Sequence, residues 1–299
     1  MADKITSYID TLPTYVDNFE YTAVIRALND FFEKKGFILV STQNRTSICA
    51  GCEDPTTVSV HEYCNKPWPM IQTGQMWLEY ELLTDKRIKK GAYCLTTSYR
   101  EEKNPIPGRH YLIFPLYEFE SFGNMQDLTK LINELLAHLG YGKPTELEYS
   151  DLAKKYNSLE LTSDHEYRMC CEYTNVCLLK NFPQYTHPFW NMAIDPETGH
   201  AKKIDVIMSG KETIGSAERS CDNETMKKMF YTISDGKYSE LFFEKFSKER
   251  TEAELQAFID LPKVERFGGG IGVTRLIDSL KQENLMDGLI NKYINCNTD

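Results

Sequence analysis

The segment 99–123, YREEKNPIPGRHYLIFPLYEFESFG, constrains the fold of this chain more than any other stretch. Asn104, Pro105, Pro107 and Gly108 exclude a continuous helix through its middle, because proline lacks a backbone N–H and glycine favours turns. The segment therefore predicts a strand, a loop and a returning strand.

Charged and aromatic side chains gather on this predicted hairpin. Arg100 and Arg109 stand at the two ends of the loop, and each guanidinium offers a planar fork of donors suited to phosphate oxygens. In the returning strand, Phe114, Glu118 and Glu120 are separated by even intervals and share one face. That face would combine phosphate-binding arginines, an aromatic platform and carboxylates able to hold an amine. A surface hairpin with scattered charges is the alternative.

The whole chain, residues 1–299, is expected to form one α+β domain. Of its residues 41% are hydrophobic, enough for one large core or two small ones. Strand and helix patterns mix without βαβ alternation, which favours a largely antiparallel sheet. Expected strands span 37–41, 92–100, 185–194 and 204–209; expected helices span 21–35, 72–83, 127–139, 224–234 and 252–261, with a mostly helical region at 144–181.

Composition also limits which binding partners and which cellular location we expect for the protein. The net charge is −10, and no lysine or arginine run typical of nucleic-acid binding is present. No apolar run approaches the roughly 20 residues of a membrane-spanning helix. Residues 1–13 contain no signal-peptide hydrophobic region, and the nine cysteines are scattered as in reduced proteins. We therefore expect a cytoplasmic protein with neither a membrane nor tRNA as partner.

One cysteine cluster has the spacing of a metal site. Cys49, Cys52, His61 and Cys64 form C-x2-C followed by H-x2-C, which could supply tetrahedral zinc ligands. We favour the alternative, an irregular segment with incidental thiols, because structural zinc sites usually carry two regular Cys/His pairs.

A second motif, IDVIMSGKETIGSAERS, repeats charged residues at intervals of seven: Asp205, Glu212 and Arg219. If Asp205 ends one strand and Glu212 begins the next, the two carboxylates face one another, and with nucleotide phosphates they could hold Mg²⁺. Arg219 could bind a carboxylate through two parallel hydrogen bonds. A network of cross-strand salt bridges would leave the same pattern.

A third motif, RFGGGIGVTRLIDSL, places four glycines before a helix that carries Arg275. Glycines let another group lie flat against the backbone, and a helix start offers free amides to an anion. The dinucleotide-binding fingerprint fails, because no acidic residue follows about 20 residues on within a βαβ unit. A plain tight turn would explain the glycines equally well.

Together these stretches resemble the catalytic domain of class II aminoacyl-tRNA synthetases of the aspartyl/asparaginyl subgroup. The hairpin at 100–120 is similar to the second motif of that family, and FGGGIGVTRL at 267–276 is similar to its third. QTGQMWLE at 72–79 resembles the amino-acid-binding helix of asparaginyl enzymes, and THPFW at 186–190 matches in order and spacing. The resemblance covers nearly the whole chain. It implies a six-stranded antiparallel sheet flanked by helices, and a homodimer.

The resemblance also implies a role for each matching residue. The residues implied to bind ATP and Mg²⁺ are Arg100 at the α-phosphate, Glu102 at the adenine amino group, Phe114 and Arg275 on the two faces of the ring, Arg109 and His110 near the outer phosphates, and Asp205 and Glu212 at the metal. Those implied to bind the amino acid are Thr73, Gln75, Glu79, Glu118, Glu120, His187 and Arg219. Arg100, Arg219 and Arg275 would be the catalytic residues.

Departures from the family decide the expected function. We expect no tRNA-reading β-barrel before the catalytic domain, because the first predicted helix starts near residue 21. Gln43 stands where the first motif usually ends in proline, which puts the dimer contact in doubt. Leu78 stands where aspartyl enzymes carry lysine, whereas Glu79 matches asparaginyl enzymes. The chain thus resembles the archaeal-type asparagine synthetase related to asparaginyl-tRNA synthetase.

The expected activity is that of an AMP-forming aspartate–ammonia ligase, with aspartate, ATP and ammonia as substrates. One alternative is a truncated paralogue that charges tRNA or another acceptor with Asp or Asn. Another is a regulatory paralogue without catalysis, against which the complete set of Arg100, Glu212, Arg219 and Arg275 argues.

Overall fold

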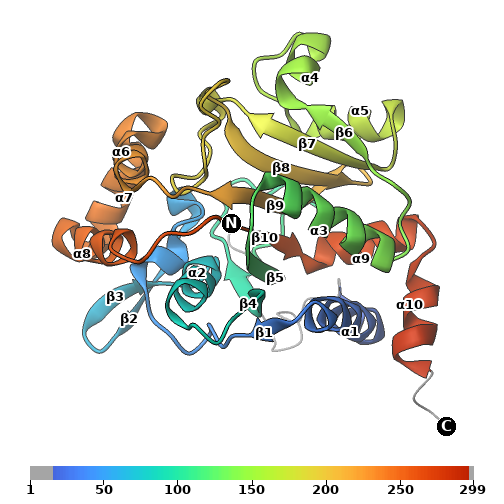
Figure 1. Cartoon of the computed structure of the whole chain (residues 1–299), viewed down its shortest axis with the longest axis horizontal. Helices are drawn as coiled ribbons and strands as arrows, with labels where there is room; N and C mark the ends of the chain where they lie inside the picture. Colours follow the sequence, from blue (N-terminus) through green and yellow to red (C-terminus); the bar gives the residue numbers. More distant parts are fainter. Residues whose placement is uncertain (1–15, 296–299) are drawn as a thin grey trace, which may run out of the picture.

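The computed structural model describes residues 16–295, and its centre is an eight-stranded mixed sheet (Figure 1). The strand order is β1-β4-β5-β10-β9-β8-β7-β6. The strands are β1 (Phe37–Leu39), β4 (Gly91–Tyr99), β5 (Ile113–Phe122), β6 (Thr145–Glu148), β7 (Val176–Phe182), β8 (Ala201–Met208), β9 (Lys211–Arg219) and β10 (Arg266–Gly272).

The expected six-stranded antiparallel sheet is wrong for the sheet as a whole. The inner strands β4, β5, β10, β9, β8 and β7 pair antiparallel, but β1 pairs with β4 and β6 pairs with β7 in parallel. A parallel neighbour requires a crossover connection, and these two connections contain helices: α2 (Gln75–Thr84), then α4 (Tyr149–Tyr156) and α5 (Ser163–Glu172).

One face of the sheet is closed by the main hydrophobic core. The helices that cover it are α1 (Asn18–Lys34), α3 (Met125–His138), α9 (Val273–Gln282) and α10 (Met286–Tyr293). Their apolar residues recur at helical spacing, and alternate strand residues such as Tyr93, Tyr117 and Phe119 meet them. The helices expected at 21–35 and 127–139 are thereby confirmed, and Asp17 and Asn124 cap their starts.

The opposite face is covered only around its margin. Helices α4 and α5 pack on β7 and β8, at the top in Figure 1, and α2 packs on β4. A separate cluster at the left in Figure 1 contains α6 (Asn223–Thr232), α7 (Lys237–Phe246) and α8 (Lys248–Ile259), which pack around Trp190. The middle of this face stays open as a cavity.

Two expected elements are wrong. Segment 185–194 is not a strand: it contains the 3₁₀ turn η4 (Gln184–Thr186), His187 has a left-handed backbone with φ of 51°, and only isolated bridges at Met192 and Ile194 join the sheet. Segment 144–181 is not mostly helical, since β6 and β7 flank α4 and α5. In β7 consecutive apolar residues are buried on both faces, so the alternating pattern of a half-exposed strand is missing.

Smaller elements complete the described chain. They are the hairpin of β2 (Val60–Tyr63) and β3 (Lys66–Pro69) and the 3₁₀ turns η2 (Ile48–Gly51), η3 (Pro55–Thr57) and η5 (Ile233–Gly236). No helix among residues 16–295 combines the length and the apolar character needed to span a membrane.

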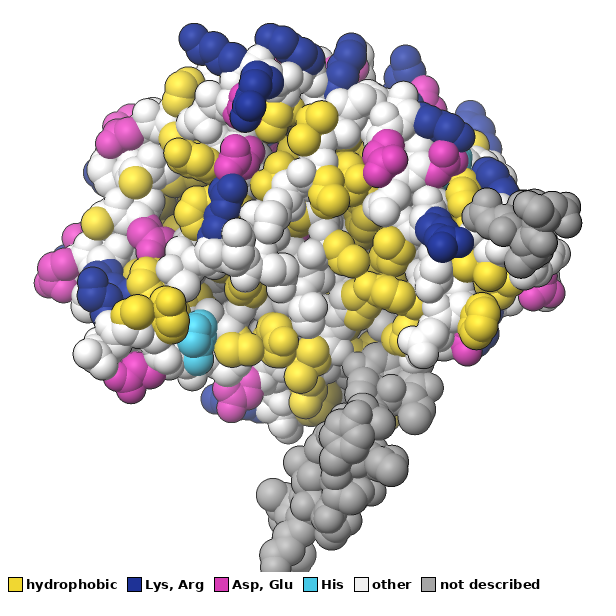
Figure 2. Space-filling view, turned by 90° about the horizontal axis from the view of Figure 1, so that it is seen from below, with side chains coloured by type: hydrophobic (Ala, Val, Ile, Leu, Met, Phe, Trp, Pro, Cys, Tyr) yellow, Lys and Arg dark blue, Asp and Glu magenta, His cyan; other side chains and the backbone are white. Residues whose placement is uncertain are grey.

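The edge strand β1 exposes apolar side chains. Ile38 is 51% and Leu39 is 61% exposed, and β1 is the outermost strand of the sheet. On the face seen from below in Figure 1, where β1 and α1 lie, hydrophobic side chains gather in a band with charged side chains around it (Figure 2). Native proteins usually cover or charge such edges.

Candidate active site

A cavity of about 380 Å³ stands over a floor of residues with little or no side chain. In β10, Gly268 pairs with Ala217 of β9, and Gly270 pairs with Gly215. Paired residues share a face of the sheet, so these four positions form one bare patch. The neighbouring strands β5 and β8 supply side chains at its two borders, about 14 Å apart at their Cα atoms, which is three strand spacings.

The β5 border carries two buried carboxylates. Glu120 pairs with Gly268 and Glu118 with Gly270, so both side chains rise beside the floor. Glu118 accepts hydrogen bonds from the Thr73 hydroxyl and, at 2.8 Å, from the Gly74 N–H. Burial raises the pKa of Glu118, and it raises the pKa of Glu120 to about 7 against the opposing effect of a neighbouring guanidinium. Buried carboxylates of this kind favour a cationic ligand.

Gly268 is required by this arrangement. A Cβ at position 268 would lie 2.0 Å from Glu120 Oε1, far inside van der Waals contact. The Glu120 side chain therefore lies against the β10 backbone at a site open only to glycine. The sequence hypothesis that the glycines admit a flat-lying group holds at this position.

Arg219 closes the floor between the two borders. Its Nη2 is 2.6 Å from Glu120 Oε1, and both side chains are almost fully buried. The Arg219 guanidinium is also 3.9 Å from a carboxylate oxygen of Glu79. None of the three hydrogen bonds to Glu120 uses Nη1, so one edge of the guanidinium is left for a ligand.

Glu79 lies behind the cavity and not in its lining. Its Oε2 is 2.7 Å from Nη2 of the fully buried Arg266, and its Oε1 accepts from Asn191 at 2.6 Å and from Gln75 at 2.9 Å. Burial alone would raise the pKa of Glu79, but Arg266 and Arg219 hold it below its usual value. Both oxygens are thus engaged by protein donors, whereas Gln75 itself lines the cavity.

The β8 border carries Asp205, and a β-bulge brings Glu212 beside it. Asp205 pairs with Gly215, and Glu212 is three residues before Gly215, an odd interval that would place it on the other face. A register shift leaves Thr213 as an extra residue, so Glu212 pairs with Ile207 and returns to the face of Asp205. The two carboxylates thus face one another across a β-bulge and not across a regular hairpin, and the sequence did not indicate this bulge.

The two carboxylates converge above Gly215. A Cβ at Gly215 would lie 3.0 Å from Glu212 Oε1 and 3.8 Å from Asp205 Oδ1. Oδ1 of Asp205 is buried and has no hydrogen-bond partner among the described residues. Burial, followed by the charge of Glu212, raises the pKa of Asp205 to about 8. An orphaned carboxylate oxygen beside a second carboxylate fits a divalent cation that takes its remaining ligands from a bound anion.

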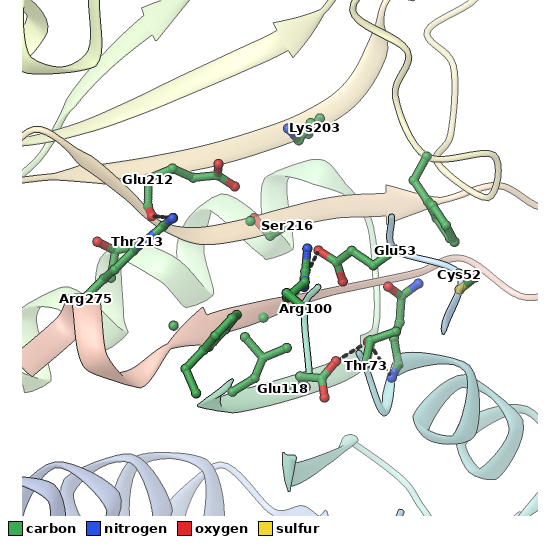
Figure 3. A pocket seen from close by; sticks show the side chains of 18 of the residues that line it. Cys52, Glu53, Thr73, Arg100, Glu118, Lys203, Glu212, Thr213, Ser216 and Arg275 are labelled. Carbon is green, nitrogen blue, oxygen red and sulfur yellow. Dashed lines mark hydrogen bonds and ion pairs between the residues drawn. The ribbon is translucent and has the colours of Figure 1, made fainter. Parts of the chain in front are cut away.

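Lys203 also belongs to the β8 border and was not predicted. It pairs with Ala217, lines the cavity, and places Nζ 2.7 Å from Asp205 Oδ2. Figure 3 shows Lys203 and Glu212 on one side of the cavity, with Glu118 and Thr73 on the opposite side. The predicted strand 204–209 began too late to include Lys203; with β8 starting at Ala201, the even interval between Lys203 and Asp205 places both on one face.

The arginines expected to bind the nucleotide, Arg100 and Arg109 at phosphates and Arg275 at the adenine ring, all line the cavity, and each is held by a protein partner. Arg100 is 3.3 Å from Glu53 and lies over the Phe114 ring at 5.9 Å. Arg109 is 2.6 Å from Glu166 of α5. Arg275 donates to the Glu212 carbonyl at 2.5 Å (Figure 3).

Nearly all residues proposed for the site from the sequence border this one cavity. Those in its lining are Thr73, Gln75, Arg100, Glu102, Arg109, His110, Phe114, Glu118, Glu120, His187, Glu212, Arg219 and Arg275. Glu79 and Asp205 stand directly behind the lining. Glu53, Lys203 and Ser216 line it without having been predicted.

The cysteine-rich segment gives no metal cluster. Cys52 is buried, Cys64 is exposed beyond β2, and no group of three or more His, Cys, Asp or Glu in the described chain is arranged to hold a metal ion. The same finding means that, among the described residues, no third such side chain is arranged with Asp205 and Glu212 to hold a metal ion; the nearby Glu166 instead accepts from the Glu212 N–H at 3.0 Å.

Comparison with known proteins identifies the family. The family model "tRNA synthetases class II (D, K and N)" matches residues 13–288. An asparagine–tRNA ligase from Koribacter versatilis (strain Ellin345) is 27% identical over 117 residues, which is 39% of this chain and 25% of that protein.

Solved structures show the same fold at low identity. Asparaginyl-tRNA synthetase from Pyrococcus horikoshii, complexed with asparaginyl-adenylate, superposes with a TM-score of 0.73 at 18% identity, covering 90% of this chain and 66% of that one. Aspartyl tRNA synthetase from Entamoeba histolytica gives a TM-score of 0.64 at 16% identity, covering 87% of this chain and 54% of that one. The chain therefore spans only part of the length of these relatives. From its fold and its family match, the chain belongs to the class II tRNA synthetases of the D, K and N type.

Proposed function

We propose that this protein activates aspartate with ATP and transfers the aspartyl group to ammonia, forming asparagine, AMP and pyrophosphate. The observation that supports it best is the bare floor, with the carboxylates Glu118 and Glu120 at one border, the Asp205–Glu212 pair at the other, and several arginines in the lining of the same cavity. An amino acid and a nucleotide can lie end to end on such a floor.

The amino acid would be held at three points. Its ammonium group would bind at Glu118 and Glu120, and one carboxylate would bind at the open edge of Arg219. If Arg219 takes the α-carboxylate, the side-chain carboxylate of aspartate is directed along the floor towards Arg100. This orientation makes the side-chain carboxyl the one that is activated.

ATP would bind at the other end of the cavity. Arg100 and Arg109 would exchange their partners Glu53 and Glu166 for phosphate oxygens. The adenine ring would lie between Phe114 and Arg275, and Glu102 would accept from its amino group. A divalent cation held by Asp205 and Glu212 would, when bound, supply positive charge to the phosphates.

Two displacements then complete the reaction. A side-chain carboxylate oxygen of aspartate attacks the α-phosphorus, the bond to the bridging oxygen breaks, and pyrophosphate leaves. Arg100 stabilises the charge that develops at the α-phosphate, and the floor aligns the two substrates. Ammonia then attacks the acyl carbon, the bond to the AMP oxygen breaks, and the ammonia nitrogen loses its proton to water.

A tRNA acceptor is the second candidate, and the curated relative, an asparagine–tRNA ligase, favours it. The net charge of −10 opposes it, because tRNA binding depends on neutralising phosphates. The two candidates also differ in which carboxyl is activated, since charging tRNA requires the α-carboxyl.

The deciding experiment measures AMP release with each of a panel of amino acids. Each amino acid is assayed in the presence of ammonium, in the presence of total tRNA, and without either acceptor. Hydroxylamine then traps the adenylate, and chromatography distinguishes the β-hydroxamate of aspartate from the α-hydroxamate. We expect ammonium-stimulated AMP release and the β-hydroxamate. The α-hydroxamate together with labelled tRNA would establish the second candidate instead.

Arg100→Ala tests the nucleotide end of the site. The variant should lose AMP release, whereas Arg87→Ala should not, because the Arg87 side chain is 90% exposed and pairs with Asp85 at the surface. Undiminished turnover in Arg100→Ala would remove the hairpin from the mechanism.

We also propose a homodimer through the edge strand β1. Among residues 16–295, no strand pairs with the outer edge of β1. This edge and the exposed Ile38 and Leu39 would be covered by the same strand of a second copy. Light scattering should give a dimer for the native chain and a monomer for Ile38→Lys/Leu39→Lys. Leu159→Lys, at a position that lies outside β1 and is more exposed than Ile38 and Leu39, is the control and should stay dimeric.

A further inference from the structure

Lys203 lines the cavity, and the proposed reaction gives its positive charge no role. Its side chain is 22% exposed, and its ammonium lies 2.7 Å from Asp205 Oδ2 and 4.1 Å from the centre of the Phe182 ring. The preceding residue, Lys202, points to the other face of β8 and pairs with Glu218 at 2.8 Å. Lys203 is thus directed towards the carboxylate pair by strand geometry.

The contact with Lys203 involves only one of the two carboxylate oxygens of Asp205. Oδ2 is taken by Lys203, whereas Oδ1 has no partner and faces the side of Glu212. No hydrogen bond or ion pair within residues 16–295 engages the Glu212 carboxylate. The protein therefore offers a metal ion Oδ1 and the Glu212 carboxylate, and the described chain supplies no third acidic, His or Cys ligand.

This ligand set is too small for a free divalent ion. Magnesium takes six oxygen ligands and usually completes its shell with substrate phosphates. When both carboxylates are ionised, the ammonium of Lys203 halves their net negative charge, and it would repel an incoming cation. Nucleotide phosphates would supply both the missing oxygens and the missing negative charge.

We propose that Lys203 is a positioning residue that excludes free metal ions from the Asp205–Glu212 pair, so that the metal enters with the nucleotide. It does so by holding Oδ2 and by balancing the carboxylate charge until phosphate arrives. This inference rests on the proposed use of ATP and a divalent cation, and it assigns an order to their binding.

The test compares Mn²⁺ binding to the intact protein by electron paramagnetic resonance of the free ion. The variants are Lys203→Met, Lys203→Arg and the control Lys202→Met, each with and without a non-hydrolysable ATP analogue. Without nucleotide, Lys203→Met should bind Mn²⁺ roughly tenfold more tightly than the native protein, even if the charge is screened as in water. Lys203→Arg and Lys202→Met should resemble the native protein. With the analogue bound, all four should retain Mn²⁺.

Two results would overturn the proposal. One is equal Mn²⁺ affinity of the native protein and Lys203→Met without nucleotide. The other is equal Mn²⁺ affinity of the native protein without and with the ATP analogue. This second measurement uses the native protein alone, so it does not depend on the folding of any variant. None of these readouts requires an amino acid, ammonia or turnover, so a wrong acceptor or substrate would leave them unchanged. Loss of Mn²⁺ binding by the native protein in every condition would refute the metal site itself.

Discussion

Replacing Gly268 with alanine should displace Glu120 from the wall of the cavity. The new Cβ would lie 2.0 Å from Glu120 Oε1 and 2.1 Å from its Cδ, whereas ordinary contact begins at 3.4 Å. The carboxylate must therefore move by more than an ångström. Glu120 is fully buried and Oε1 is 2.6 Å from Arg219 Nη2, so this movement breaks their ion pair.

The expected cost follows from that broken pair. Separating the partners of a buried ion pair typically costs about 3–5 kcal/mol. Alanine recovers about 0.4–1 kcal/mol by restricting the unfolded chain. We therefore expect the free energy of unfolding to fall by about 2–4 kcal/mol, the difference between these two effects.

Urea unfolding followed by intrinsic fluorescence measures this change, and ATP–pyrophosphate exchange measures the KM for the amino acid. Gly268→Ala should raise that KM strongly and leave the KM for ATP nearly unchanged. Gly272→Ala is the matched control, because its Cβ would come no closer than 3.7 Å to a neighbour. In the Glu120→Ala background, Gly268→Ala should cost little, since the clashing side chain is gone. Equal losses in both backgrounds, or no loss in either, would refute the proposed clash.

Three further predictions concern the same cavity. Arg266→Met leaves Glu79 buried without its main partner and should lower the free energy of unfolding by about 3–5 kcal/mol in urea; Arg266→Met/Glu79→Met should recover most of this loss. Glu120 binds an ammonium group only when ionised, and its pKa is about 7 in the free protein, so amino-acid affinity should rise as pH increases through 7. Calorimetry between pH 6 and 8 should show this rise in the native protein but not in Glu120→Gln. Phe114→Leu should raise the KM for ATP roughly fivefold through lost ring stacking, with the amino-acid KM unchanged.

Much of the site could be predicted from the sequence because it depends on local periodicity. The even intervals between Phe114, Glu118 and Glu120 place them on one face of any strand, and the structure keeps them there. The glycine run likewise indicated a backbone open to close approach, which Gly268 shows. Recognition of the family depended on several such motifs in one order.

Other features depend on partners that are remote in the chain. Glu79 meets Arg266 across 187 positions and Glu120 meets Arg219 across 99, and no local pattern indicates which carboxylate pairs with which guanidinium. The same holds for the parallel edge strands β1 and β6, whose direction follows from helical crossovers.

The sequence by itself therefore determined which side chains share a strand face and which residues turn the chain, because both follow from the geometry of neighbouring residues. Only the tertiary structure decided that Glu79 lies behind the cavity, that a bulge at Thr213 turns Glu212 towards Asp205, and that Lys203 occupies one Asp205 oxygen. These outcomes follow from strand pairing and from competition for buried partners, which arise when distant segments pack together.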